Sequence, residues 1–380
     1  MTEVGPAIRF RQSSVPPRAY LVVNTQFDNA GDALIIRELI NLISGRATPC
    51  IYLGRAPDAF VNMLELEKLS SVTVHRTRAY VGACVDMLSA RARGECCYYF
   101  LTPGGLIGEK TVKQTVIETL RLAIMAVLAL SGVKICQLGF SLEKVGNRHA
   151  RLLRWRSKLL SVCAPRDSAS VALAKDLGMR TTGMSVDLSL NLFSLPRIGS
   201  RRSGVIALSF RIDKDELARA RAMQFVEALC DTMDESCRII CVAQVGRDVP
   251  FMKEIYEHVS SLWSGNSDFI DCHESVGGAV EVYGMCEAVI SNRLHVLLLA
   301  LYAYASPVAW VNPDVDSKIF SVFEMLGISE FAVTAEQCVP GDVLKLLRPT
   351  GFDGAQWADE LSDLFDRIFS ITPLESLESA

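Results

Sequence analysis

The sequence lacks most of what a membrane-spanning, secreted or nucleic-acid-binding protein needs. Its 380 residues carry a formal net charge of −4, so no overall positive charge is available to attract nucleic acid. The apolar runs at residues 122–130 and 294–305 are too short to cross a bilayer, and we predict that both are buried core helices. Residues 1–18 contain no apolar signal core and are predicted to be a loose leader.

The twelve cysteines show no pairing pattern. No CxxC pair is present, and the nearest approaches to metal-ligand spacing are Cys272–His273 and Cys237 with Cys241. Scattered single cysteines are typical of buried, reduced thiols rather than of a secreted disulfide framework. We therefore predict a cytoplasmic protein without a bound metal.

Short apolar runs of strand length alternate with helical patterns along the whole chain. Alternation of this kind predicts parallel sheets covered by helices. The predicted strands span residues 20–24, 51–53, 72–74, 97–101, 133–138, 205–210, 238–244, 288–291 and 308–311. The fold class is therefore α/β, with two doubly wound, Rossmann-like lobes in a GT-B-like arrangement.

A polar segment rich in glycine and serine interrupts this alternation near residue 200, as a domain linker does. An amphipathic helix at residues 355–369 follows the last predicted strand and closes the chain. The predicted organisation is a leader at 1–18, a first lobe at 19–195, a linker at 196–204, a second lobe at 205–350, and a C-terminal helix with its tail at 351–380.

The most informative polar residues follow the predicted strand at 288–291. Asn292, Arg293 and His295 open a helix that is otherwise apolar. A cation at this junction adds to the free N–H groups and the dipole of the helix, so the junction predicts an anion site. The alternative is that Ser291 caps the helix and His295 is a satisfied structural side chain. The other histidines are interpreted as structural or solvated: His75, His149, His258 and His273.

Further motifs accompany this one in both halves of the chain. They are Asn29-Ala-Gly-Asp32, Arg166-Asp-Ser-Ala-Ser170, Asp187-Leu-Ser-Leu190, Ser209-Phe-Arg211, and the pair Pro307 and Lys318. Together with Ser291–His295, they resemble the polysaccharide pyruvyl transferase family from about residue 20 to about residue 330. The chain departs from the family pattern at Pro103-Gly104-Gly105, where a glycine triplet is expected, and at Gln137-Leu-Gly-Phe-Ser141.

The resemblance implies that phosphoenolpyruvate donates a pyruvyl group to two hydroxyls of a sugar, forming a cyclic ketal without cofactor or metal. The implied acceptor is a sugar, commonly part of a lipid-linked oligosaccharide in bacterial members. Because the donor carries a phosphate and a carboxylate, its site needs at least two cations, and arginine suits both groups. The predicted donor-binding residues are Arg293, Arg211, Ser209, Arg166 and Asn292.

Proton transfer to the donor's methylene carbon needs a general acid, and His295 is the predicted one. Asp32 or Asp187 is the predicted base, and the predicted acceptor-binding residues are Asn29, Gly31, Gly104 and Gly105. Simpler interpretations stay open. Asp32 would cap a helix and Gly31 would supply a turn. Arg166 with Asp167, and Arg211 with Asp213 or Asp215, would form surface ion pairs.

Arg148, Arg151, Arg154 and Lys158 share one helical face, with Trp155 beside them. This face predicts contact with anionic lipid or a lipid-linked diphosphate, and therefore a peripheral position at the inner face of a membrane. The alternative is a solvated basic face.

Two rival functions also fit the sequence. One is a GT-B glycosyltransferase that uses a nucleotide sugar, with a ribose-binding acid from residues 281–287. The other is a non-catalytic subunit of a glycan-assembly complex.

Overall fold

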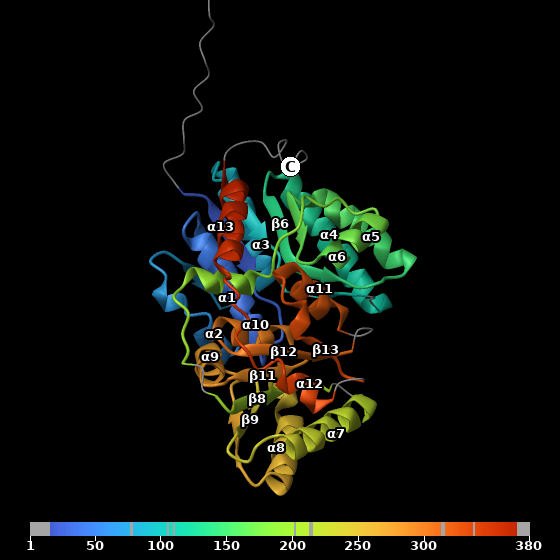
Figure 1. The fold of residues 1–380 in the computed structure, drawn as a ribbon. Helices are drawn as coiled ribbons and strands as arrows, with labels where there is room; N and C mark the ends of the chain where they lie inside the picture. Colours follow the sequence, from blue (N-terminus) through green and yellow to red (C-terminus); the bar gives the residue numbers. More distant parts are fainter. Residues whose placement is uncertain are drawn as a thin grey trace, which may run out of the picture.

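The computed structural model describes residues 16–76, 79–104, 106–108, 111–200, 203–212, 216–312, 316–336 and 339–370. Two α/β lobes follow one another along the chain, each built on a parallel sheet with helices on both faces (Figure 1). This arrangement confirms the predicted fold class. The predicted linker at 196–204 joins the short helix η2 (Leu188–Ser194) to the first strand of the second lobe, β8 (Val205–Ser209).

The first sheet has seven strands in the described residues, in the order β3-β2-β1-β4-β6, and both β5 and β7 pair with β6. The strands are β1 Arg18–Val22, β2 Thr48–Tyr52, β3 Thr73–His75, β4 Cys97–Phe100, β5 Leu106–Ile107, β6 Lys134–Leu142 and β7 Val162–Pro165. The helices of this lobe are α1 Ala30–Ser44, α2 Asp58–Met63, η1 Leu66–Lys68, α3 Ala79–Ala92, α4 Val112–Leu130, α5 Asn147–Leu159 and α6 Ser168–Asp176.

The second sheet has the order β10-β9-β8-β11-β12-β13. Its further strands are β9 Arg238–Ala243, β10 Asn266–Asp271, β11 Ala288–Ser291, β12 Ser306–Val311 and β13 Ala332–Thr334. Its helices are α7 Glu216–Thr232, η3 Gly246–Asp248, α8 Val249–Leu262, α9 Val276–Gly284, α10 Leu294–Tyr302, α11 Ser317–Leu326, η4 Ser329–Phe331 and α12 Pro340–Leu344. The sequence prediction missed β5, β7, β10 and β13. Of these, β10 is an edge strand whose polar sequence lacks an apolar run.

The C-terminal helix α13 (Ala355–Phe369) has the predicted bounds and packs back on the first lobe (Figure 1). Phe365 stacks on Phe100 of β4 with ring centroids 5.9 Å apart, and Arg46 pairs with Asp366 at 2.6 Å. The helix therefore closes the chain across both lobes, because the residues before it belong to the second lobe.

The two apolar runs noted in the sequence differ in their burial. Residues 294–302 form α10, whose apolar residues are all buried, as predicted. Residues 122–130 belong to α4, where Met125 and Leu128 are buried but Ile124, Val127 and Leu130 are exposed. The prediction of a buried core helix is wrong for α4, because this helix lies on the outside of the sheet and no described element covers its outer side. Among the described residues, no helix has the length and apolar character needed to span a bilayer.

Both sheets reverse their strand order at a central pair, β1 with β4 in the first lobe and β8 with β11 in the second. Ligands of open α/β sheets bind beyond the carboxyl ends of such pairs. The lobes meet there directly, since Ala30 N–H donates to Gln244 O at 3.3 Å and Gly246 N–H donates to Asp28 O at 2.7 Å.

Candidate active site

A cleft of about 580 Å³ lies between the lobes at these strand ends. Its wall brings together many of the residues predicted from the sequence: Asn29, Asp32, Gly104, Arg166, Arg211, Asn292, Arg293 and His295. They come from both lobes, so the intact cleft depends on the lobes meeting as they do. Gly105 lies outside the described residues.

The cleft wall is strongly cationic. Among the described residues, its basic side chains are Arg166, Arg211, Arg247, Arg293 and Lys318. Burial lowers the pKa of Lys318, and the nearby charges of Arg166 and Arg211 lower it further. Cations placed so close together repel one another, so the cleft favours a ligand that carries more than one negative charge.

Arg293 is fixed from both sides. Its guanidinium pairs with the buried carboxylate of Asp248, and its backbone N–H donates to Ser291 Oγ at 3.0 Å. Burial lowers the pKa of Arg293, while the charge of Asp248 opposes that shift. Arg293 Nε is buried and has no hydrogen-bond partner among the described residues. The described residues therefore leave this donor unsatisfied beside the amino end of α10, where helix N–H groups and the dipole favour an anion.

The pairing of β8 with β11 explains why two arginines converge. Ser209 and Ser291 are register partners, and Arg211 and Arg293 each follow two residues later. The amide of Asn292 accepts from Arg211 N–H at 2.7 Å and donates to Arg211 O at 2.8 Å. Asn292 thus holds the backbone of Arg211 in place. Ser209 is buried at the end of the strand and is not part of the cleft wall, and its contact with the donor stays a prediction.

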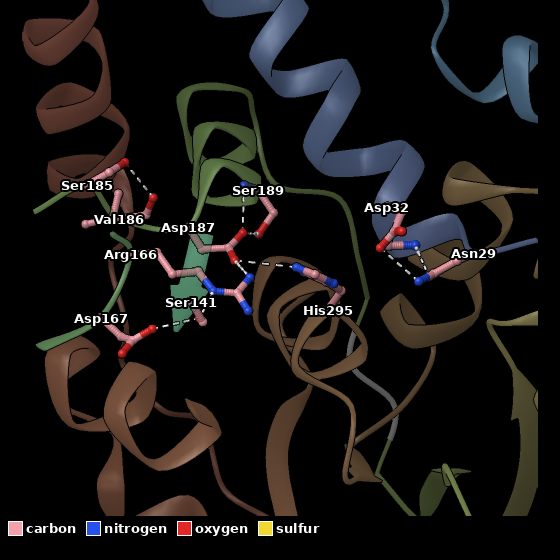
Figure 2. Close-up of polar contacts among 11 residues, drawn as sticks. Asn29, Asp32, Ser141, Arg166, Asp167, Ser185, Val186, Asp187, Ser189 and His295 are labelled. Atoms are coloured by element: carbon pink, nitrogen blue, oxygen red, sulfur yellow. Dashed lines mark hydrogen bonds and ion pairs between the residues drawn. The ribbon is translucent and has the colours of Figure 1, made fainter. Parts of the chain in front are cut away.

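His295 faces a buried carboxylate supplied by the other lobe. Its Nε2 lies 3.4 Å from Asp187 Oδ2, and Arg166 Nη1 donates to the same oxygen at 2.7 Å (Figure 2). The second oxygen of Asp187 accepts from Ser189 N–H and Ser189 Oγ–H at 3.0 and 2.7 Å. Asp187 therefore accepts from a guanidinium and lies beside an imidazole whose charge it would balance on protonation.

The carboxylate of Asp187 is fully buried. Burial by itself would raise its pKa, but the opposing charges and hydrogen bonds of His295, Arg166 and Ser189 prevail and hold the pKa well below its usual range. A carboxylate with such a low pKa and no exposed oxygen is a weak base for a sugar hydroxyl. This geometry does not support the predicted role of Asp187 as a base. It supports a role in orienting His295.

Arg166 is supported by a buried polar network in the first lobe. Its Nε donates to Ser141 Oγ at 2.8 Å, and that hydroxyl donates to Asp167 Oδ2 at 2.7 Å (Figure 2). Asp167 also caps α6 by accepting from Ser170 N–H at 2.7 Å. The alternative of a surface ion pair between Arg166 and Asp167 is wrong, because both side chains are buried.

The amino end of α1 forms the opposite wall of the cleft. Asn29 is its N-cap, since the amide oxygen accepts from Gly31 N–H at 2.9 Å. Asp32 accepts from the side chain of Asn29 (Figure 2). It also accepts from the side chain of Thr25 and remains partly exposed. Asp32 is therefore not the cap, and it is a carboxylate that a ligand in the cleft can reach.

Gly31 is helical and does not provide the left-handed turn considered from the sequence. A β-carbon built at this position would lie 2.8 Å from both Cβ and Nδ1 of His295. The missing side chain therefore lets the imidazole approach the amino end of α1. Gly31 acts on the histidine and is not itself part of the cleft wall.

We expect Gly31→Ala to lower kcat by roughly tenfold to hundredfold, because displacing a reacting group by a fraction of an ångström has effects of this size. Steady-state rates and the melting temperature would be measured for both proteins. Gly45→Ala is the matched control, since Gly45 ends the same helix and a β-carbon there meets nothing within 4 Å. Equal losses of kcat in both variants would contradict a steric effect of the new methyl group on His295.

The sequence prediction missed several residues of the wall. Thr25 and Gln26 follow β1, Gln244 and Arg247 follow β9, and Lys318 was noted without a role. Their position just beyond the carboxyl ends of strands was the available signal. Gly104 has φ of +76° and donates its N–H to Gly139 O at 3.0 Å, which brings its backbone to the cleft.

The basic face of α5 is exposed as the sequence pattern indicates: Arg148, Arg151, Arg154, Trp155 and Lys158. Lys158 Nζ lies over the Trp155 ring at 4.7 Å. Whether this face contacts anionic lipid stays a prediction. In the described residues, no group of three or more His, Cys, Asp or Glu side chains is placed to hold a metal ion.

The fold and the cleft together define a two-lobed α/β protein with a cationic cleft between its lobes. The family model for polysaccharide pyruvyl transferase matches residues 29–303, so the chain belongs to that family. No curated protein matches the chain.

Solved structures of the same architecture have low sequence identity. The HepE protein of Anabaena in complex with UDP is 13% identical, with a TM-score of 0.55, and the match covers 96% of this chain and 100% of that one. The UDP-GlcNAc 2-epimerase of Methanocaldococcus jannaschii is 10% identical, with a TM-score of 0.53 and coverage of 92% and 98%. At this level of sequence identity, the similarity concerns the fold alone.

Proposed function

We propose that the chain transfers the pyruvyl group of phosphoenolpyruvate to two hydroxyls of a sugar, forming a cyclic ketal and releasing phosphate. The observation that carries this proposal is the cationic cleft, in which arginines of both lobes surround one histidine held by a buried carboxylate. A small substrate with two anionic groups next to a protonatable carbon matches these groups.

The donor's phosphate and carboxylate would be held by the guanidinium groups and by the backbone N–H groups at the amino end of α10. Leu294, His295 and Val296 begin that helix and line the cleft. Arg293 contributes its guanidinium on the cleft wall, and Lys318 adds a further charge from α11. The second lobe is therefore the proposed donor side.

His295 is the proposed general acid. Its Nε2 is enclosed against Asp187, so we assign Nδ1 as the nitrogen presented to the cleft. Protonation of the methylene carbon by Nδ1–H would leave C2 electron-deficient, and a sugar hydroxyl would attack it. Loss of phosphate and attack by the second hydroxyl then give the ketal. Of the two hydroxyl protons released, one restores His295 and one leaves with the phosphate.

Asp32 is the proposed base for the attacking hydroxyl. It lies on the cleft wall beside His295, and its carboxylate is partly exposed. The first lobe, with Asn29, Asp32 and Gly104, is the proposed acceptor side. An oligosaccharide on a lipid carrier is the proposed form of the acceptor, and the cytoplasmic face of a membrane is the proposed site of action.

The glycosyltransferase alternative receives less support from the cleft. Residues 281–287 were its predicted source of a ribose-binding acid, and none of them lies on the cleft wall. The carboxylate of Glu287 accepts from Gly204 N–H at 2.7 Å, at the other end of the second sheet. A non-catalytic subunit would not need the pairing of His295 with Asp187, so this pairing favours a catalytic role.

The test is to incubate the purified protein with phosphoenolpyruvate and candidate sugar or lipid-linked acceptors. The expected result is release of phosphate together with an acceptor mass gain of one pyruvyl unit. A parallel reaction with UDP-sugars should give no transfer. Release of UDP with sugar transfer, or no binding of phosphoenolpyruvate in calorimetry, would overturn the proposal.

We expect Arg293→Ala to weaken donor binding by roughly tenfold to hundredfold, because a charge-assisted contact contributes about 1.5–3 kcal/mol. The Kd for phosphoenolpyruvate would be measured by calorimetry. Arg219→Ala is the control, since Arg219 is a partly exposed cation of the same lobe that pairs with Glu254 outside the cleft. Arg293→Ala leaves the buried carboxylate of Asp248 without its partner. The double variant Arg293→Ala/Asp248→Asn removes that charge, and so separates a loss of binding from a loss of stability. An unchanged Kd in both Arg293 variants would contradict the assignment.

A further inference from the structure

Neighbouring helices of the first lobe carry exposed apolar side chains on their outer side. Val81 and Val85 project from α3, and Val112, Val116, Leu120 and Leu130 from α4; these six residues define the α3–α4 ridge. Leu120 is 62% exposed and Leu130 is 89% exposed. Single exposed apolar side chains are ordinary, but a ridge that continues across two helices marks an interaction surface.

The ridge and the basic face of α5 point the same way. Met87 of α3, Met125 of α4 and Leu153 of α5 belong to one core cluster under these helices. Helix α4 packs between α3 and α5, so the sides of all three helices opposite this core form one continuous outer surface. Figure 1 shows α4 and α5 side by side on the outside of the first lobe.

Charge distinguishes the edge of this surface from its centre. Arg148, Arg151 and Lys158 are exposed on α5 in a protein whose formal net charge is −4. Trp155 lies among them and is 62% exposed. Apolar side chains bordered by cations and an exposed tryptophan are the pattern of a surface that lies in the plane of an anionic bilayer.

We propose that the outer surface of α3, α4 and α5 docks on an anionic lipid bilayer, with the α3–α4 ridge in the interface and the basic face of α5 against the headgroups. A second copy of the chain fits this surface less well. A symmetric contact through the ridge would bring two cationic edges toward each other, whereas anionic headgroups neutralise them.

A second cavity lies between the proposed docking surface and the cleft. It has a volume of about 1020 Å³, opens beside the ridge between Tyr80 of α3 and Leu120 of α4, and shares Asn24 with the cleft. Arg76 and Arg121 stand on its wall. If the proposed reaction uses a lipid-linked acceptor, docking would place a path from the headgroups to the cleft. This last step rests on the proposed function, and the docking itself does not.

Vesicle co-sedimentation tests the docking without any substrate. The wild-type chain should partition onto vesicles of phosphatidylglycerol and phosphatidylcholine, and less onto phosphatidylcholine alone. Val116→Gln/Leu120→Gln should lower the partition coefficient by roughly tenfold to hundredfold, since two apolar side chains leave the interface. Arg148→Gln/Arg151→Gln should lower it by roughly tenfold or more on anionic vesicles only, and added salt should reduce this difference.

Leu262→Gln is the matched control, because Leu262 is exposed on α8 of the second lobe and should not affect partitioning. All substituted positions are exposed, so the melting temperatures should stay close to wild type. Equal partitioning of the ridge variant and wild type would overturn the proposal. So would a dimer in sedimentation analysis that the ridge variant dissociates, because the ridge would then bind a second copy. If the wild-type chain binds the vesicles but transfers no pyruvyl group, the proposed function fails and the docking proposal stands.

Discussion

Replacing His295 by glutamine is expected to lower kcat by roughly 10²–10⁴-fold, the usual span for the loss of a general acid. The binding of phosphoenolpyruvate should change much less, because the cations that would hold the donor lie on other residues of the cleft wall. Glutamine keeps a polar group of similar reach next to Asp187 but cannot deliver a proton to carbon. Single-turnover rates and the Kd of the donor, measured on the same protein, separate the two effects.

A matched histidine elsewhere makes this test specific. His258 lies on α8 of the second lobe, pairs with Glu227 at 2.9 Å and is not part of the cleft wall. His258→Gln should leave kcat within about twofold of wild type, as expected for a surface substitution away from the chemistry. A near-normal rate in folded His295→Gln protein would remove His295 from the proton-transfer step and leave the cleft as a binding site.

The lobes and most of their strands could be predicted because strand and helix periodicities are local properties of the chain. The run at residues 288–291 became β11 with the predicted bounds, and α13 also begins and ends where its amphipathic pattern does. The convergence of Arg211 and Arg293 could be anticipated as well, since parallel strands bring their carboxyl ends to one edge of a sheet.

Contacts between the lobes could not be predicted in this way. That Asp187 meets His295 depends on a pairing across more than one hundred residues of sequence, and a short Asp-Leu-Ser motif does not reveal burial. The role of Gly31 became visible when the position of the imidazole was known. Burial of α4 was misjudged for a related reason: composition shows that a helix is apolar, but not whether another element covers it.

Asp187→Asn is expected to lower the free energy of unfolding by about 3–5 kcal/mol, because the guanidinium of Arg166 would stay buried without its counter-charge. It should also reduce kcat by roughly 10²–10⁴-fold, as where a carboxylate orients a catalytic histidine. Urea unfolding and steady-state kinetics measure the two losses. Asp167→Asn is the control: Asp167 is buried in the same network through Ser141, but it does not contact His295. It should lose stability while keeping most of its activity.

The pH dependence follows from the sign of the shift. Because the folded protein holds the pKa of Asp187 below its ordinary value of about 4, the ionised carboxylate stabilises the fold above that pH. This contribution is lost as the pH falls toward the folded pKa, since the unfolded chain takes up the proton first. Wild-type stability should therefore fall more steeply below about pH 4 than that of Asp187→Asn. Parallel stability curves for the two proteins would show that Asp187 is not held ionised by His295 and Arg166, and the orienting role would fail with it.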